Sequence, residues 1–197
     1  MQTPTDSWLN AAVPRRRGKS SRRALIIETS LRILAERGMQ GLNHRAVSEV
    51  AGLPQGSSAY YFPHRDSLAI GAMERAVADY RDRLKPLSDN AAAFTTRRAA
   101  EFLTGFVHDR LSVHRDRSLA EYELRLAARR RPELHGQAIQ FHELLTNALA
   151  RHVRDTATVR LACATITGYI LQELTSHTPP DRAEIFTMVR QALGLDR

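Results

Sequence analysis

Hydrophobic residues recur along most of the chain at spacings of three and four, the period of an amphipathic α-helix. The clearest stripe runs from residue 68 to residue 84 and predicts a long helix that ends near Pro86. No segment alternates apolar and polar residues as a half-buried strand would. The pattern therefore predicts an all-α protein. The members of the long stripe are Leu68, Ala72, Met73, Ala76, Val77, Tyr80 and Leu84.

The same period predicts helices on both sides of this stripe. A first helix should carry an apolar face of Ala24, Ile27, Leu31, Leu34 and Ala35. Two short helices, described next, follow it. Helix-start signals at Pro132, Asp155 and Thr178 to Asp181 help to place later helices. The total is about nine helices, and those beyond Pro86 are expected at residues 99–111, 119–130, 134–152, 159–174 and 185–193.

Residues 43–62 have the features of two short helices joined by a tight turn. Asn43 can cap the first of them, with Leu42 packing on Val47 as a hydrophobic staple. Gly52 is the residue type that ends helices in a left-handed conformation, and we expect the second helix to open at Gln55. This is the layout of a helix-turn-helix, whose second helix enters the major groove of DNA. The turn alone also fits an ordinary helical hairpin.

Longer sequence motifs resolve that ambiguity. The run from Arg22 to Leu68 resembles the N-terminal domain of TetR-type transcriptional regulators. One departure is Ser58-Ala59, where many family members have a Leu-Tyr pair, so that Tyr60 could take over a backbone contact. The matching pieces are Ala35-Glu36-Arg37-Gly38, Ala46-Val47-Ser48-Glu49-Val50-Ala51-Gly52-Leu53-Pro54, Gly56-Ser57, Tyr61-Phe62 and Arg65-Asp66-Ser67-Leu68.

The resemblance implies a three-helix DNA-binding domain followed by a larger helical domain for effector binding and dimerisation. Arg45 and the residues that open the second helix, Gln55, Ser57 and Ser58, are expected to meet bases or phosphates. A second group is expected to hold phosphates, although Asn43 could only cap and Tyr61 could only pack. That group is Asn43, His44, Tyr60, Tyr61 and Arg65.

Charge is distributed as this division requires. Residues 15–65 contain ten basic and three acidic residues, whereas the chain from Asp66 onward contains nineteen basic and seventeen acidic ones. A basic first module suits nucleic acid, and anionic lipid is a weaker reading because no suitable apolar face adjoins the arginines. We expect a basic arm at 1–19, which could also be a solvated tail, a DNA-binding domain at 20–66 and an effector and dimerisation domain at 67–197.

The resemblance also implies a ligand pocket and a four-helix dimer interface in the second domain. For the pocket we select aromatic residues with two polar partners, although aromatic residues at helical spacing also serve as plain core. The dimer stripes could likewise face the core of a single chain. The pocket candidates are Phe102, Phe106, His108, Glu121, Tyr122, Phe141 and Tyr169, and the dimer candidates are Ala162, Ile166, Ile170, Ile185, Val189 and Leu193.

Other chemistry finds little support. Gly18-Lys19-Ser20 lacks the upstream glycine and strand of a phosphate loop, and the eight histidines and single Cys163 have no metal-site spacing. We therefore expect no catalytic residue, no metal and no cofactor, no membrane span and a cytoplasmic location. The sequence predicts a homodimeric repressor that leaves a palindromic operator when an unknown small molecule binds. The alternative is a DNA-binding protein without an effector, and a helical enzyme is the least supported class.

Overall fold

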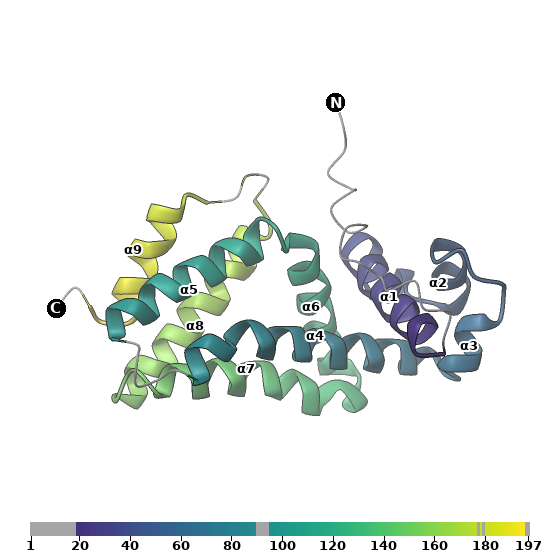
Figure 1. Cartoon of the computed structure of the whole chain (residues 1–197), viewed down its shortest axis with the longest axis horizontal. Coiled ribbons are helices and arrows are strands. Elements are labelled where there is room, and N and C mark those ends of the chain that lie inside the picture. Colours follow the sequence, from purple (N-terminus) through teal and green to yellow (C-terminus); the bar gives the residue numbers. More distant parts are fainter. Residues whose placement is uncertain (1–18, 90–94, 177, 179, 196–197) are drawn as a thin grey trace.

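The computed structural model describes residues 19–89, 95–176, 178 and 180–195, and the described residues form nine α-helices and two short 3-10 helices without a β-strand. The helices form an N-terminal and a C-terminal group joined by α4 (Figure 1). The predicted all-α fold is confirmed. The expected arm at residues 1–19 lies outside the described residues except for Lys19, where the first helix begins.

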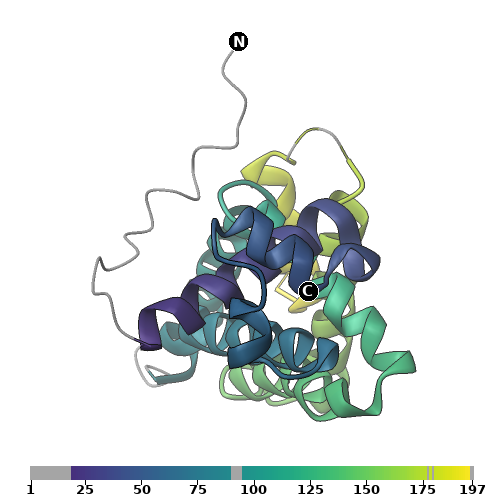
Figure 2. The same ribbon diagram turned by 90° about the vertical axis from the view of Figure 1, so that its right-hand side faces the viewer.

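The N-terminal group consists of α1 (Lys19–Gly41), α2 (His44–Val50) and α3 (Ser57–Tyr61). Figure 2 views the molecule from this end, with α2 and α3 toward the viewer. Helix α1 packs against α2, α4 and α6, so it buries more than one stripe. Ile26 and Ile33 are therefore buried in addition to the predicted Leu31 and Leu34, whereas Ala24, expected on the apolar face, is exposed.

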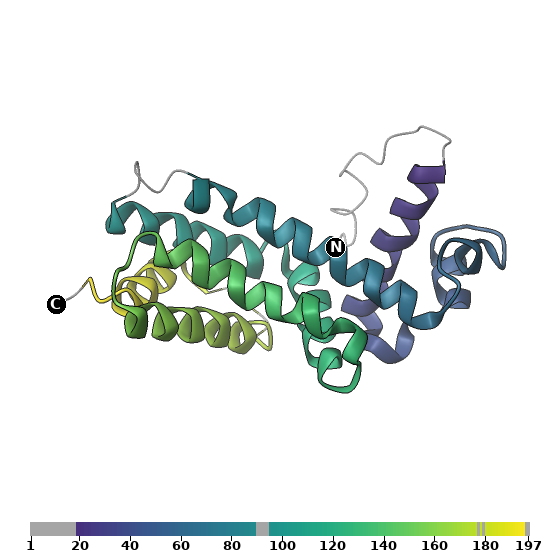
Figure 3. The ribbon, with the colours of Figure 1, turned by 90° about the horizontal axis from the view of Figure 1, so that it is seen from below.

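Helix α4 (Arg65–Asp89) connects the two groups, and all seven residues of its predicted stripe are buried. It continues three residues beyond Pro86, which lies close enough to the end that few helical hydrogen bonds are affected. The predicted boundary between residues 66 and 67 therefore falls inside one helix. Helix α4 packs along α7 (Figure 3).

The C-terminal group contains the five helices that the sequence predicts, with shifted ends. Asp155 caps α8 as expected, by accepting from the backbone amide of Thr158 at 2.9 Å. Pro132 opens a 3-10 helix, and α9 starts after Asp181, so the expected cap at Thr178 is wrong. The elements are α5 (Thr96–Leu111), α6 (Arg115–Ala127), η3 (Ala128–Arg130), η4 (Pro132–Leu134), α7 (His135–Ala150), α8 (Thr156–Glu173) and α9 (Arg182–Ala192).

An aromatic cluster with a buried ion pair occupies the core of the C-terminal group. The ring of Tyr80 meets those of Phe106 and Phe141 edge to face, at centroid distances of 5.5 and 5.1 Å. The Arg110 guanidinium lies over the Tyr80 ring and bonds the Glu121 carboxylate at 2.8 Å. Because the side chains of Arg110 and Glu121 are only 3% and 5% exposed, the burial of this pair carries a large desolvation penalty, and each charge depends on the other.

Candidate nucleic-acid interface and ligand pocket

Helix α2 starts as its sequence predicts. The Asn43 side chain accepts from the Ala46 amide at 2.9 Å and donates to the Gly41 carbonyl at 3.2 Å, while Leu42 and Val47 are fully buried. The helix ends at Val50 with Ala51 as its C-cap, and Gly52 follows at φ 63°, in the left-handed region where a side chain is disfavoured. Asn43 thus has a confirmed capping role, and its contact to phosphate stays a prediction.

A cluster of polar side chains, rather than apolar ones, joins α2 to α3. The Ser58 hydroxyl donates to the His44 carbonyl at 3.1 Å, and it lies 3.1 Å from the Ser48 hydroxyl and 3.3 Å from Nδ1 of His44. Ser48 and Ser58 are both fully buried. Hydroxyls at these positions satisfy one another's hydrogen bonds, which is what allows them to be buried. This hydroxyl cluster fixes the angle between the two helices.

The hydroxyl cluster corrects three expectations. Ser58 is buried and therefore cannot touch DNA. His44 has one ring nitrogen at the Ser58 hydroxyl and the other buried, so the ring does not offer a phosphate contact in this conformation; burial also lowers its pKa. The helix begins at Ser57, not at Gln55, which places Gln55 in the turn before it.

The remaining predicted contacts lie at the outer end of the N-terminal group of α1, α2 and α3, which we call the head. Tyr60 is 71% exposed and rests edge to face on the half-buried Tyr61 at 5.1 Å. Gln55 and Arg45 are exposed, and Ser57 is half-exposed at the first position of α3. These side chains have the donors and the reach that base edges and phosphates need, and their DNA contacts stay predictions. Arg65 begins α4, and its side chain lies outside the described part of the structure.

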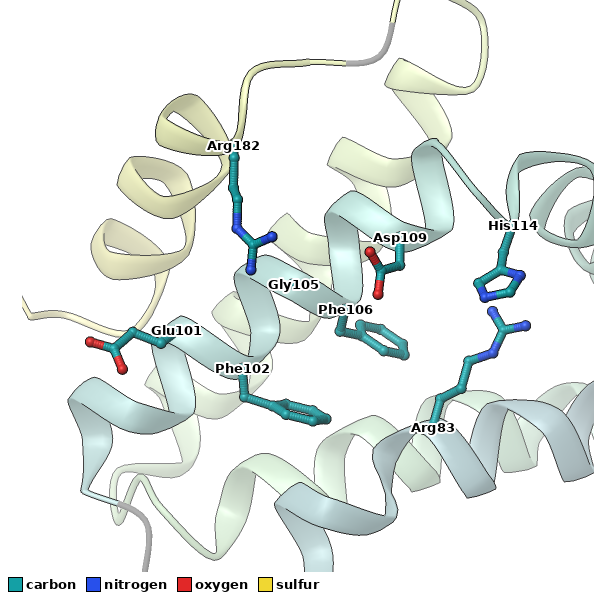
Figure 4. Close-up of a pocket in the computed structure, with 8 residues that line it drawn as sticks. All are labelled: Arg83, Glu101, Phe102, Gly105, Phe106, Asp109, His114 and Arg182. Atoms are coloured by element: carbon teal, nitrogen blue, oxygen red, sulfur yellow. The ribbon is translucent and has the colours of Figure 1, made fainter.

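A pocket of about 360 Å³ opens in the C-terminal group (Figure 4). The rings of Phe102 and Phe106 extend from α5 toward α4 and give it an apolar wall, and Arg83 of α4 reaches toward His114 at one end. Arg182 reaches across from α9 to Gly105 of α5, where an added Cβ would lie 3.3 Å from its Nη2. The complete lining is Arg83, Glu101, Phe102, Gly105, Phe106, Asp109, His114 and Arg182.

Two basic side chains, Arg83 and His114, lie at the end of the pocket near α6, with Asp109 on the facing helix. Burial lowers the pKa of Arg83, and the nearby Arg110 adds to the effect. Burial also lowers the pKa of His114, followed by the influence of Arg83, while Asp109 opposes the change. Desolvation and like charges act together at this end. A guanidinium held this way gains more from an anionic partner than one in bulk water does.

Two of the seven predicted ligand residues line this pocket, and their role in ligand binding stays a prediction. Phe102 and Phe106 line the pocket, but Glu121, Tyr122 and Phe141 belong to the buried core cluster. His108 lies beside the pocket residue Asp109, at 3.6 Å from its carboxylate, without lining the pocket. Tyr169 is instead bonded to Glu184 of α9 at 3.2 Å. These side chains satisfy one another, so helical spacing could not separate core from pocket.

The charged residues of the pocket were not among the predicted ligand residues. Arg83 comes from α4, His114 from the turn after α5, and Arg182 from α9. They are distant in sequence and are scattered among many other basic residues. One weak signal was available: Arg83 and Tyr80 are three residues apart on α4, so a polar side chain neighbours the aromatic core.

Helix α6 adjoins the pocket at its start and packs along the head over its length. His114 lines the pocket and immediately precedes the first residue of α6. One turn further, Arg117 bonds Glu28 of α1 at 2.8 Å and Asp79 of α4 at 3.3 Å. Near its other end, the Glu123 carboxylate accepts from the Met39 amide at 3.4 Å. Helix α6 therefore contacts α1 near both of its ends.

The predicted dimer residues are wrong. All six have 5% exposure or less within a single chain, because the broad apolar stripes of α8 and α9 pack on each other and on α5 and α7. The opposite face of α8 is open, and Leu161 and Leu171 on it are 59% and 44% exposed. Ala164 and Gly168 lie between them and are exposed too. The six corrected residues are Ala162, Ile166, Ile170, Ile185, Val189 and Leu193.

Neither a metal site nor a membrane span is found in the described ranges. No group of three or more His, Cys, Asp or Glu side chains there is placed to hold a metal ion. No described helix combines the length and apolar character needed to cross a membrane.

Known proteins share this architecture. The family model for the Tetracyclin repressor-like C-terminal domain matches residues 94–195, more than half of the chain. A TetR family member from Streptomyces coelicolor A3, SCO1917, is 31% identical with a TM-score of 0.73, covering 87% of this chain and 97% of that one. The multidrug binding protein EbrR in complex with ethidium is 30% identical with a TM-score of 0.70, covering 89% and 99%.

A curated relative supports the same assignment over a shorter segment. The HTH-type transcriptional regulator PksA of Bacillus subtilis strain 168 is 33% identical over 76 residues. That alignment covers 39% of this chain and 37% of PksA, so the chain spans little more than a third of that relative. Together with the helix-turn-helix head, the family model and the solved relatives lead to one conclusion: the chain belongs to the TetR family of transcriptional regulators.

Proposed function

We propose that this regulator is a homodimeric repressor that binds a palindromic operator and leaves it when a small molecule enters the pocket lined by Phe102 and Phe106. The observation that carries the proposal is the position of α6. One end of this helix adjoins the pocket residue His114, and its length packs on α1 of the DNA-binding head. Ligand binding and head orientation thus share one rigid element, as a release mechanism requires.

Ligand-bound relatives support the effector part of the proposal. EbrR has been solved in complex with ethidium, proflavin and malachite green. The same fold can therefore hold a small molecule. In this protein the ligand must favour the DNA-incompetent state, because a ligand with equal affinity for both states shifts no equilibrium.

We place the dimer interface on the open face of α8. Leu161, Ala164, Gly168 and Leu171 follow one another at spacings of three and four, which puts them on one side of the helix. Small residues between two leucines allow a second helix to approach closely. A twofold axis here would present two heads to successive major grooves. Leu161→Glu should then yield monomers in sedimentation velocity, whereas Arg154→Glu, an exposed change outside α8, should leave the dimer intact.

The test of the whole proposal is selection of bound sequences from random duplexes at two salt concentrations. We expect a palindromic consensus, two protomers per duplex and a steep salt dependence from released counterions. Selected duplexes that share no preferred sequence would refute specific recognition.

Operator release separates the proposal from its alternative. A DNA-binding protein without an effector would hold the selected operator whatever small molecule is added. Screening a set of neutral, cationic and anionic aromatic compounds for operator release should find at least one active compound. Complete inactivity across the set, together with intact operator binding, would favour the effector-free alternative.

A further inference from the structure

We propose that the effector is a small organic acid, with an aromatic or similarly flat apolar body against Phe102 and Phe106 and its carboxylate on Arg83. This inference rests on the proposed function because it concerns the ligand of the same pocket. It adds the chemical class, which neither the family assignment nor the fold supplies.

Arg83 is the first argument. Its guanidinium points from α4 toward the imidazole of His114 at one end of the pocket (Figure 4). Nitrogen atoms of these two side chains therefore lie close together there. Among the described residues, no carboxylate lies within ion-pair distance of Arg83. Asp79, one turn before Arg83 on α4, is already bonded to Arg75 at 2.9 Å and to Arg117 at 3.3 Å. A carboxylate from a ligand would supply the missing anion in the favourable bidentate geometry.

The surrounding charges strengthen the preference for an anion. Arg110 lies behind the Phe106 ring, with its guanidinium carbon 5.6 Å from the ring centre, and Arg117 also contributes positive potential at Arg83. Their carboxylate partners, Glu121 and Glu28, bond them at 2.8 Å each. Asp79 and Glu121 oppose part of this positive potential at Arg83, but neither is in an ion pair with Arg83 itself. A cationic ligand would have to approach this end against repulsion.

The two acids of the lining do not reverse this conclusion. Glu101 lies 3.4 Å from Nε of Arg97 on the same helix, and Asp109 lies 3.6 Å from Nδ1 of His108. Arg182 adds a second guanidinium to the wall. Both acids are carried by α5; Glu101 lies at the end of the pocket far from Arg83, whereas Asp109 lies on the side nearer to His114 (Figure 4). The pocket thus has Arg83 and His114 at one end with Asp109 on the facing helix, the rings of Phe102 and Phe106 in the middle, and Glu101 at the other end.

Size limits the ligand to a small molecule. A volume of about 360 Å³ lies at the lower end of the roughly 300–1,000 Å³ usual for ligand pockets. A two-ring aromatic acid is of suitable size, and 2-naphthoate is therefore our probe. The neutral 2-naphthamide has almost the same shape, and proflavin is a flat aromatic cation. Comparison of the three separates charge from shape.

The experiment is isothermal titration calorimetry on the full chain. We expect 2-naphthoate to bind at least about tenfold more tightly than 2-naphthamide, which corresponds to about 1.4 kcal/mol. Arg83→Gln should remove about that factor for the acid only. The control Arg81→Gln, an exposed arginine on the same helix outside the pocket lining, should change nothing.

Each other outcome has a definite meaning. Equal affinity for acid and amide, tighter binding of proflavin, or no saturable binding of 2-naphthoate would overturn the inference. The comparison of acid with amide needs no variant, so it holds even if Arg83→Gln folds poorly. Operator release by proflavin but not by 2-naphthoate would overturn the organic-acid assignment alone. Binding of 2-naphthoate without release of operator would leave the pocket assignment standing and refute ligand control.

Discussion

The buried pair of Arg110 and Glu121 gives a sharp quantitative prediction for the core. Burial alone would lower the pKa of Arg110, but the adjacent Glu121 carboxylate, together with Tyr80 and Tyr122, raises that pKa overall. Arg125 also contacts the same carboxylate, at 3.3 Å. In Glu121→Gln the amide keeps the shape but removes the negative charge. Arg110 then remains buried with no anion beside it.

The structure allows the size of this effect to be estimated. Removing one partner of a buried pair costs about 3–5 kcal/mol, and the 3% and 5% exposure of the side chains places this pair in that class. For a chain of this length each kcal/mol lowers the melting temperature by about 2–4 °C, so the expected loss is about 6–20 °C. The assay is thermal unfolding followed by circular dichroism, with urea titration for the free energy of unfolding.

Two further variants complete this test. The exposed pair of Arg97 and Glu101 is the matched control, since its side chains are 82% and 54% exposed, and Arg97→Gln should cost less than about 1 kcal/mol. Replacing both Arg110 and Glu121 by Met should recover most of the stability, because no unpaired charge is left in the core. A Glu121→Gln variant as stable as Arg97→Gln would refute the burial of the pair.

Three more predictions concern the DNA-binding head. Ser58→Ala leaves a hydroxyl and an imidazole nitrogen of the hydroxyl cluster without their partner, and it should lower the free energy of unfolding by about 1–3 kcal/mol in urea titrations. Because burial lowers the pKa of His44 below its usual 6.5, the unfolded chain takes up the proton first. Stability should therefore decline as the pH falls below about 6.5, and less steeply in His44→Asn; an unchanged slope would contradict this. Gly38 and Gly52 both have positive φ, but a Cβ at Gly38 would lie 3.2 Å from the Glu123 carboxylate whereas the space at Gly52 is open. Gly38→Ala should thus cost more than Gly52→Ala, and the reverse order in thermal unfolding would refute the close approach.

Local sequence signals predicted local structure well. The Asn43 cap, the Gly52 turn and the stripe of α4 depend on neighbours within a few residues, so the sequence states them directly. The motifs of the family resemblance are also short contiguous segments, so they located the helix-turn-helix within the head. Errors of one to four residues at helix ends arise where tertiary contacts decide whether the last turn persists.

Long-range arrangements were the part that sequence could not supply. An apolar stripe such as Ile166 and Ile170 shows that a helix is covered, but it does not show whether the cover comes from its own chain or a partner. The hydroxyl of Ser58 looked suited to DNA and proved to hold two helices together. The pocket gathers Arg83, His114 and Arg182 from three separate segments, a set that only the folded chain defines.

The turn that carries Gln55 and the start of α3 are proposed to read base pairs. The most direct measurement compares Gln55→Ala with the unchanged protein on the selected operator and on every single-base variant of it. We predict a loss of about 1–3 kcal/mol that is concentrated at one or two base pairs per half-site. A loss spread evenly over all positions, or no loss on any duplex, would contradict base reading by this part of the head.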